Sequence, residues 1–90
     1  MNLTSVPTMH PQVAERTVDG TAVIVLADLG EVKILNPVGT RVWESVDGKR
    51  TVQQIVDMIV AEFEVAASQA QEDVVDFLQQ LVDVQAIRLL

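Results

Sequence analysis

The hydrophobic pattern of the chain changes once, at Asn36-Pro37, and this change most constrains the fold. Before it, β-branched and apolar residues alternate with polar ones or form a short uncharged run. After it, apolar residues recur at intervals of three and four, which is the helical period. The 90 residues are therefore expected to form one small α+β domain with its strands first and its helices second.

Three short strands are expected in the first part of the chain. They cover residues 12–18, 21–27 and 31–35. Asp19-Gly20 lies between the first two, and an Asp-Gly pair favours a type I′ turn because both turn residues need positive φ. The segment 21–27 is uncharged, as expected of a central strand. The pattern predicts a three-stranded antiparallel sheet with residues 31–35 at one edge.

The first predicted helix begins at Asn36, an expected N-cap followed by Pro37 at the first helical position, and ends at Gly48. Trp43 lies at helical spacing from the apolar residues of this helix and is expected in the core.

Two further helices and a short strand complete the predicted fold. Thr51 and Gln54 fit a capping box that opens the second helix. Ser68 and Gln71 fit another, which opens a third helix over about residues 69–84. An apolar tail at residues 86–90 is expected to end as a strand. The pattern is that of a winged helix-turn-helix.

The terminal segments and the composition of the chain bear on its domain organisation and its class of function. Residues 1–11 are expected to be a flexible arm, and residues 12–90 the single domain. The chain has no cysteine and one histidine, His10, so no metal site, cofactor or catalytic constellation is expected. It shows no secretory signal and no membrane-spanning run, so a cytoplasmic protein without a membrane partner is expected.

Charge argues against nucleic acid, which is the natural ligand to consider for a winged helix. The net charge is −7, and residues 51–90 hold seven acidic residues and one basic residue, Arg88. The predicted third helix carries acidic residues but neither lysine nor arginine, so phosphates would be repelled. The carboxylates are interpreted as a solvated helix face. A winged-helix nucleic-acid binder stays the disfavoured alternative.

Two features favour peptide binding. The strand at 31–35 leaves an edge to which an extended peptide can pair. The third helix is apolar over an arc of about 180°, counted at 100° per residue, and a helix on a core needs little more than 100°. A structural homodimer is the alternative occupant of this surface. The candidate peptide-binding residues are Glu31, Val32, Lys33, Ile34, Leu35, Gln71, Val75, Leu78, Gln79 and Val82.

Two motifs carry a family resemblance. The first is Leu35-Asn36-Pro37-x-Gly39 followed by Val42-Trp43-Glu44, and the second is the run DGKRTVxxIV over residues 47–56. Over about residues 12–89 the chain resembles the PqqD-like family, also called RiPP recognition elements.

The resemblance implies a non-catalytic domain that binds the leader region of a ribosomally synthesised precursor peptide. Such a domain presents the leader to a maturation enzyme, such as a radical SAM enzyme or a leader peptidase or cyclase. The implied pathways are pyrroloquinoline quinone synthesis, lasso-peptide synthesis or a related one.

Overall fold

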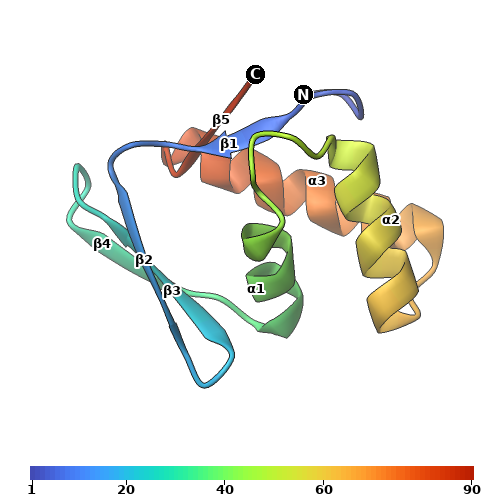
Figure 1. Ribbon diagram of the computed structural model, residues 1–90, viewed down its shortest axis with the longest axis horizontal. Coiled ribbons are helices and arrows are strands. Elements are labelled where there is room, and N and C mark those ends of the chain that lie inside the picture. The colour runs from blue at the N-terminus through green and yellow to red at the C-terminus, as the bar shows by residue number, and fades with distance from the viewer.

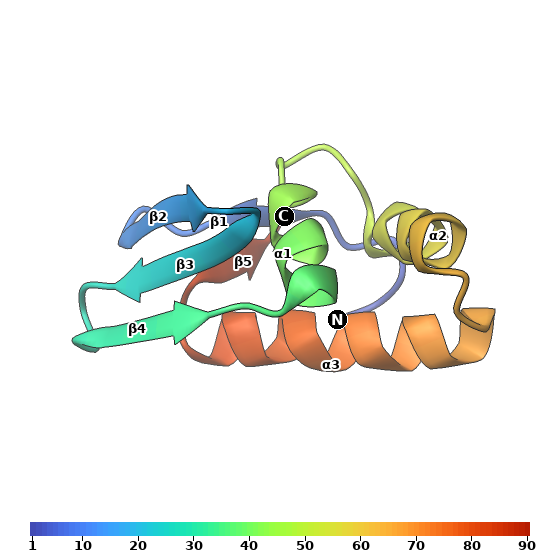
Figure 2. The ribbon, with the colours of Figure 1, turned by 90° about the horizontal axis from the view of Figure 1, so that it is seen from below.

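The computed structural model describes all 90 residues as five strands and three helices. In chain order they are β1 (Pro7–Met9), β2 (Val13–Val18), β3 (Thr21–Leu26), β4 (Glu31–Ile34), α1 (Pro37–Glu44), α2 (Val52–Phe63), α3 (Ala67–Asp83) and β5 (Ile87–Leu89). The sheet of β2, β3 and β4 lies on one side of α1 and helix α2 lies on the other (Figure 1). Helix α3 runs along the length of the molecule, from α2 to the sheet (Figure 2). The predicted α+β winged helix-turn-helix architecture is confirmed.

The three-stranded sheet is antiparallel in the order β2-β3-β4, so β4 forms one edge. Asp19 and Gly20 have φ values of 51° and 77°, as the expected tight turn between β2 and β3 requires. Side chains alternate between the two faces of a strand. In β3 the even-numbered residues Ala22, Ile24 and Leu26 are buried, so this face of the sheet packs on the helices.

Local side-chain chemistry sets the starts of two helices. The Asn36 Oδ1 atom accepts a hydrogen bond of 2.6 Å from the Gly39 backbone N–H at the start of α1. At α2, the Gln54 N–H donates to Thr51 Oγ1 at 3.2 Å, while Gln54 Oε1 accepts from the Thr51 N–H at 2.8 Å. Both expected caps are confirmed.

The expected capping box at the third helix is wrong. Helix α3 begins at Ala67 and its N-cap is Ala66, which makes no side-chain hydrogen bond. The chain leaves α2 through Glu64 in the left-handed conformation, at φ 52°, and this brings it into α3 before Ser68 is reached. The start of α3 is therefore determined by the link from α2 and by packing, not by a cap.

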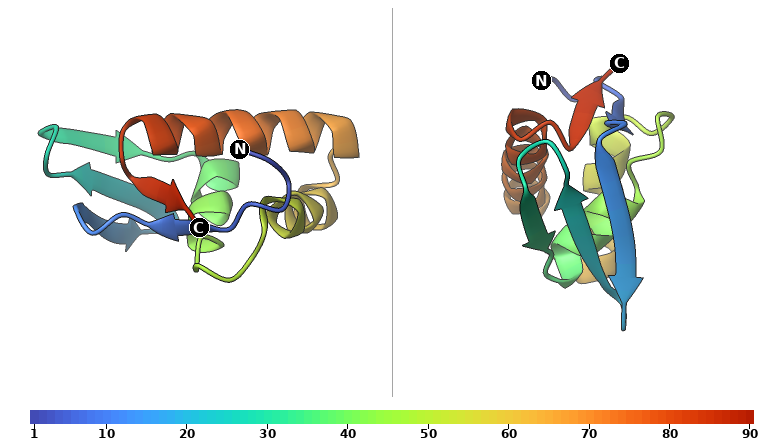
Figure 3. Two further views of the ribbon diagram at one scale, coloured as in Figure 1. Left: turned by 90° about the horizontal axis from the view of Figure 1, so that it is seen from above. Right: turned by 90° about the vertical axis from the view of Figure 1, so that its left-hand side faces the viewer.

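The N-terminal segment differs from the expected arm, because Pro7–Met9 form β1. This strand pairs antiparallel with β5, in the register Thr8 opposite Arg88, so the two ends of the chain lie side by side (Figure 3). The backbone oxygens of Leu3 and Ser5 also accept hydrogen bonds from the first N–H groups of α2. Helix-start N–H groups have no partner within their helix, and here the N-terminal segment supplies it.

The core is one cluster of 17 buried hydrophobic residues. Trp43 is its largest side chain and is 1% exposed, so its predicted core position is confirmed. The indole N–H of Trp43 donates a hydrogen bond to a carboxylate oxygen of Glu15 in β2, which fixes α1 against the sheet.

We predict that the capping box at Thr51 and the unformed one at Ser68 give unequal responses to alanine substitution. Thr51→Ala removes an acceptor for a helix-start N–H and is expected to lower the free energy of unfolding by about 1 kcal/mol. Ser68→Ala, the matched control, is expected to change it by less than about 0.5 kcal/mol, because Ser68 caps nothing. Urea denaturation followed by circular dichroism measures both. Equal losses would contradict the assignment of the α3 start.

Candidate functional site

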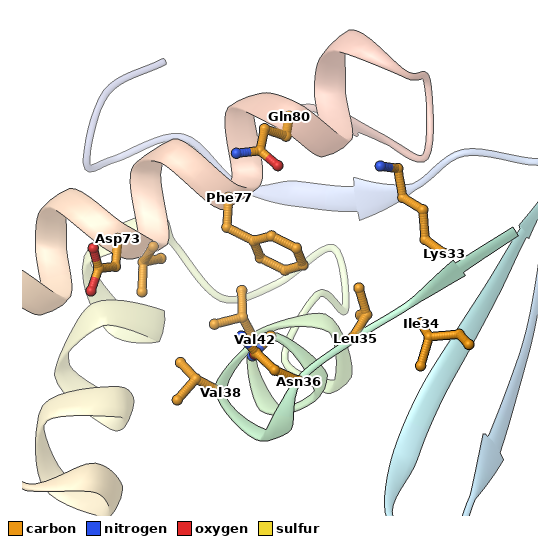
Figure 4. A pocket seen from close by; sticks show the side chains of 11 residues that line it. Lys33, Ile34, Leu35, Asn36, Val38, Val42, Asp73, Phe77 and Gln80 are labelled. Carbon is orange, nitrogen blue, oxygen red and sulfur yellow. The ribbon is translucent and has the colours of Figure 1, made fainter. Parts of the chain in front are cut away.

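A groove lies beside the free edge of β4, between that strand and α3, with α1 as its floor (Figure 4). Its volume is about 500 Å³. The strand and the turn into α1 contribute Lys33, Ile34, Leu35 and Asn36, α1 contributes Val38, Gly39 and Val42, and α3 contributes Asp73, Val74, Phe77 and Gln80. Strand edge and groove are thus parts of one surface.

The backbone of β4 offers hydrogen bonds to this surface. The Leu35 N–H donates to the Ala22 oxygen of the neighbouring β3 segment at 3.0 Å. Because backbone groups of successive residues in a strand point to opposite edges, Lys33 also faces β3, and Val32 and Ile34 face the free edge. The Val32 and Ile34 side chains are 61% and 75% exposed. The N–H and C=O groups of these two residues are therefore available to an added strand.

The middle of the groove is apolar. Phe77 projects from α3 over α1, toward Val42 and Leu35 (Figure 4). A Cβ atom at Gly39 would lie 3.0 Å from Asn36 Oδ1, which is a tight approach, and 3.5 Å from Phe77 Cζ, which is an ordinary van der Waals contact. The glycine therefore serves the cap of α1, where its N–H donates to Asn36 Oδ1.

The ends of the groove carry opposite charges. Asp73 lies at one end and Lys33 at the other, with Phe77 between them (Figure 4). One Asp73 carboxylate oxygen accepts a hydrogen bond of 2.9 Å from Gln69 Nε2. Lys33 belongs to neither of the two ion pairs of the molecule, which join Arg41 to Glu62 and Arg50 to Asp47.

Perturbed pKa values occur away from the groove. The pKa of the Asp47 carboxyl is lowered because it accepts backbone hydrogen bonds from Arg50 and Lys49 in the turn before α2. The pKa of Arg41 is raised by its hydrogen bond to Glu62, which links α1 to α2. No group of three or more His, Cys, Asp or Glu side chains is placed to hold a metal ion. No helix has the length and apolar character needed to cross a bilayer.

The structure brings together only some of the predicted site residues. Lys33, Ile34 and Leu35 line the groove, and Val32 presents its backbone at the free edge. The side chain of Leu35 is buried, so it belongs to the groove floor. Glu31 begins β4, and its backbone groups face β3.

The predicted residues of the third helix lie outside the groove. Leu78 is fully buried in the core, so it is not available to a peptide. Val75 and Val82 are half-buried and pack against the same core, which accounts for the wide apolar arc of this helix. Gln71 and Gln79 are exposed and do not line the groove.

Sequence reasoning missed Asp73, Phe77 and Gln80. At 100° per residue these lie on the opposite margin of the apolar stripe from Val75 and Val82. In the sequence both margins look alike, because the margin that faces β4 depends on where α2 and β5 pack on α3. Phe77, a large aromatic at the border of the stripe next to an acidic residue, was the available signal.

The fold and this site define a class of protein: a small α+β domain of winged helix-turn-helix type with a groove beside an unpaired strand edge. The chain belongs to the PqqD family, because the family model for coenzyme PQQ synthesis protein D matches residues 11–87. No curated protein matches the chain.

Two solved structures are similar to the chain. One is described as "TbiB1 in Complex with the TbiA(beta) Leader Peptide" and is 26% identical, with a TM-score of 0.83 over 90% of this chain and 94% of that chain. The other is described as "Lasso peptide synthetase B1 complexed with the leader peptide". It is 16% identical, with a TM-score of 0.82 over 92% of this chain and 98% of that chain, and this likeness shows the shared fold.

We predict that the two margins of α3 respond differently to a new charge. Val82→Glu buries a carboxylate against the core and is expected to lower the free energy of unfolding by about 1–3 kcal/mol. Gln80→Glu adds the same charge two residues away on the exposed groove wall and is expected to cost less than about 0.5 kcal/mol. Urea denaturation compares them, and a Gln80→Glu loss as large as that of Val82→Glu would place the groove wall in the core.

Proposed function

We propose that the chain binds the leader region of a ribosomally synthesised precursor peptide and presents it to a maturation enzyme. The leader adds as a strand to the free edge of β4, beside residues 31–35. The observation that carries this proposal is the combination of an unpaired strand edge with an adjoining apolar groove. Membership of the PqqD family and similarity to two proteins described in complex with leader peptides support it.

The backbone of β4 and the side chains of the groove have separate roles in binding. The outward N–H and C=O groups of Val32 and Ile34 bind the backbone of any extended peptide. Every second side chain of the added strand then points to the groove side of the sheet, where it meets Phe77, Val38 and Val42. Hydrogen bonds to the edge supply affinity, and the groove supplies selection.

In this proposal the chain is a binding protein and the chemistry belongs to its partner. The groove lining contains no histidine or cysteine, and its two charged side chains lie at opposite ends. They are therefore not arranged as an acid–base pair, which needs two groups within reach of one substrate atom. The partner enzyme would be a radical SAM protein or a leader peptidase, in the cytoplasm, where a newly made ribosomal product is first available.

The two alternatives fit the groove less well. The exposed face of α3 carries Glu72, Asp73, Asp76 and Asp83, which repel nucleic-acid phosphates. Full antiparallel pairing of β4 with β4 of a second copy places Val32 against Ile34 and Lys33 against Lys33. Like charges directly opposite one another destabilise a strand pair, so this fully paired register is unfavourable for a second copy.

We predict that proline substitutions on neighbouring β4 residues have different effects. Ile34→Pro removes an N–H that faces the free edge, so the domain is expected to stay folded and lose peptide capture. Lys33→Pro removes an N–H that faces β3, so it is expected to disrupt the sheet. Ile34→Ala is the matched control, because it removes the same side chain but keeps the N–H.

Peptides selected from a displayed library of random twelve-residue sequences provide the probe. Folding is followed by circular dichroism and binding by calorimetric titration. Ile34→Ala is expected to keep most of the affinity that Ile34→Pro loses. Selection of no binding peptide, or equal affinity for wild type and a folded Ile34→Pro variant, would rule out strand addition to β4.

A further inference from the structure

The groove has a chemical direction. Lys33 is the third residue of β4, and Asp73 lies on α3 at the opposite end of the groove (Figure 4). Between them the apolar side chains of Phe77 and Leu35 lie at the centre of the lining, and the neutral polar residues Asn36 and Gln80 border them. A ligand that fills the groove therefore meets a cation, an apolar surface and an anion in a fixed order.

Both charged side chains can still form an ion pair with a ligand. Lys33 is half-buried and belongs to neither ion pair of the molecule. Asp73 accepts one hydrogen bond, from Gln69, and forms no ion pair. A peptide seated in the groove removes part of the water from both groups. Removing water from a charge is unfavourable unless an opposite charge replaces it, and this selects complementary partners.

Side chains alternate between the two faces of a strand, so the order of charges along the groove sets the spacing of the complementary residues in the peptide. On an antiparallel added strand, the residue opposite Lys33 directs its side chain to the same face as Lys33, which is the groove side. The next groove-side residue, two positions earlier in the peptide, lies opposite Leu35. The one before that lies toward Asp73.

We infer that the groove selects leader segments of the pattern basic–x–apolar–x–acidic, read from the peptide N-terminus. The basic side chain pairs with Asp73, the apolar one packs on Phe77, and the acidic one pairs with Lys33. The inference rests on the proposed function and deepens it, because it gives the register and the side-chain chemistry of the bound segment, taken as an antiparallel strand. Lys33 and Asp73 are its specificity-determining residues.

Selection from the random twelve-residue displayed library tests this pattern. Wild type is expected to enrich peptides with this pattern. Peptides selected on Lys33→Glu are expected to carry a basic residue in place of the acidic one, and those selected on Asp73→Lys an acidic residue in place of the basic one. Lys49→Glu and Glu72→Lys make the same changes of charge outside the groove and are expected to leave the selected pattern unchanged. Circular dichroism confirms that each variant is folded.

Titration gives the size of the effect. Lys33→Glu is expected to weaken a peptide selected on wild type by a factor on the order of ten, since attraction becomes repulsion. Replacing the acidic residue of that peptide by lysine is expected to restore affinity for this variant. Because these charges remain partly accessible to solvent, wild-type affinity should fall as salt rises.

The outcomes separate the two proposals. Three results for peptides that need the Ile34 N–H would overturn the charge pattern and leave strand addition intact. They are the absence of a charge preference, the reverse order of charges, and an unchanged pattern with Lys33→Glu. Enrichment of no peptide, or of peptides that bind the folded Ile34→Pro variant as well as wild type, would overturn strand addition itself.

Discussion

The structure depends on the burial of one stripe along α3. Ala70, Val74, Leu78 and Leu81 are each no more than 1% exposed. Full burial of a valine or leucine side chain stabilises a fold by about 1.5–3 kcal/mol, so this stripe is a main source of stability in a chain with few aromatic residues. Helix α2 and strand β5 both pack on α3, and its remaining margin is left as the wall of the groove. The same helix therefore holds the core together and forms the binding surface.

Features coded by neighbouring residues were predictable from the sequence. Asn36 and Thr51 accept hydrogen bonds from N–H groups three residues ahead, and Asp19-Gly20 makes a turn by its own conformational preference. The strand edge at residues 31–35 followed from the order of the strands. These interactions need no knowledge of the rest of the chain, so the fold class and half of the site could be anticipated.

Features that depend on distant partners were not predictable. The pairing of β1 with β5 joins a three-residue strand containing Pro7 to the other end of the chain. The choice between the two margins of α3 depends on which neighbours cover Val75 and Val82 and which leave Phe77 accessible. Periodicity finds the apolar stripe of a helix, but only tertiary packing decides which of its borders faces an opening.

The pairing of β1 with β5 also has a consequence for the order of folding. Closing a contact between residues near both ends restricts almost the entire chain, and such closures are entropically costly and slow. The pair is therefore expected to form after the hairpins and helices have condensed. Because Leu3 and Ser5 of the same segment hold the first N–H groups of α2, its opening would fray that helix as well. The start of α2 and the two chain ends are thus linked as one unit, on contacts separate from those that line the groove.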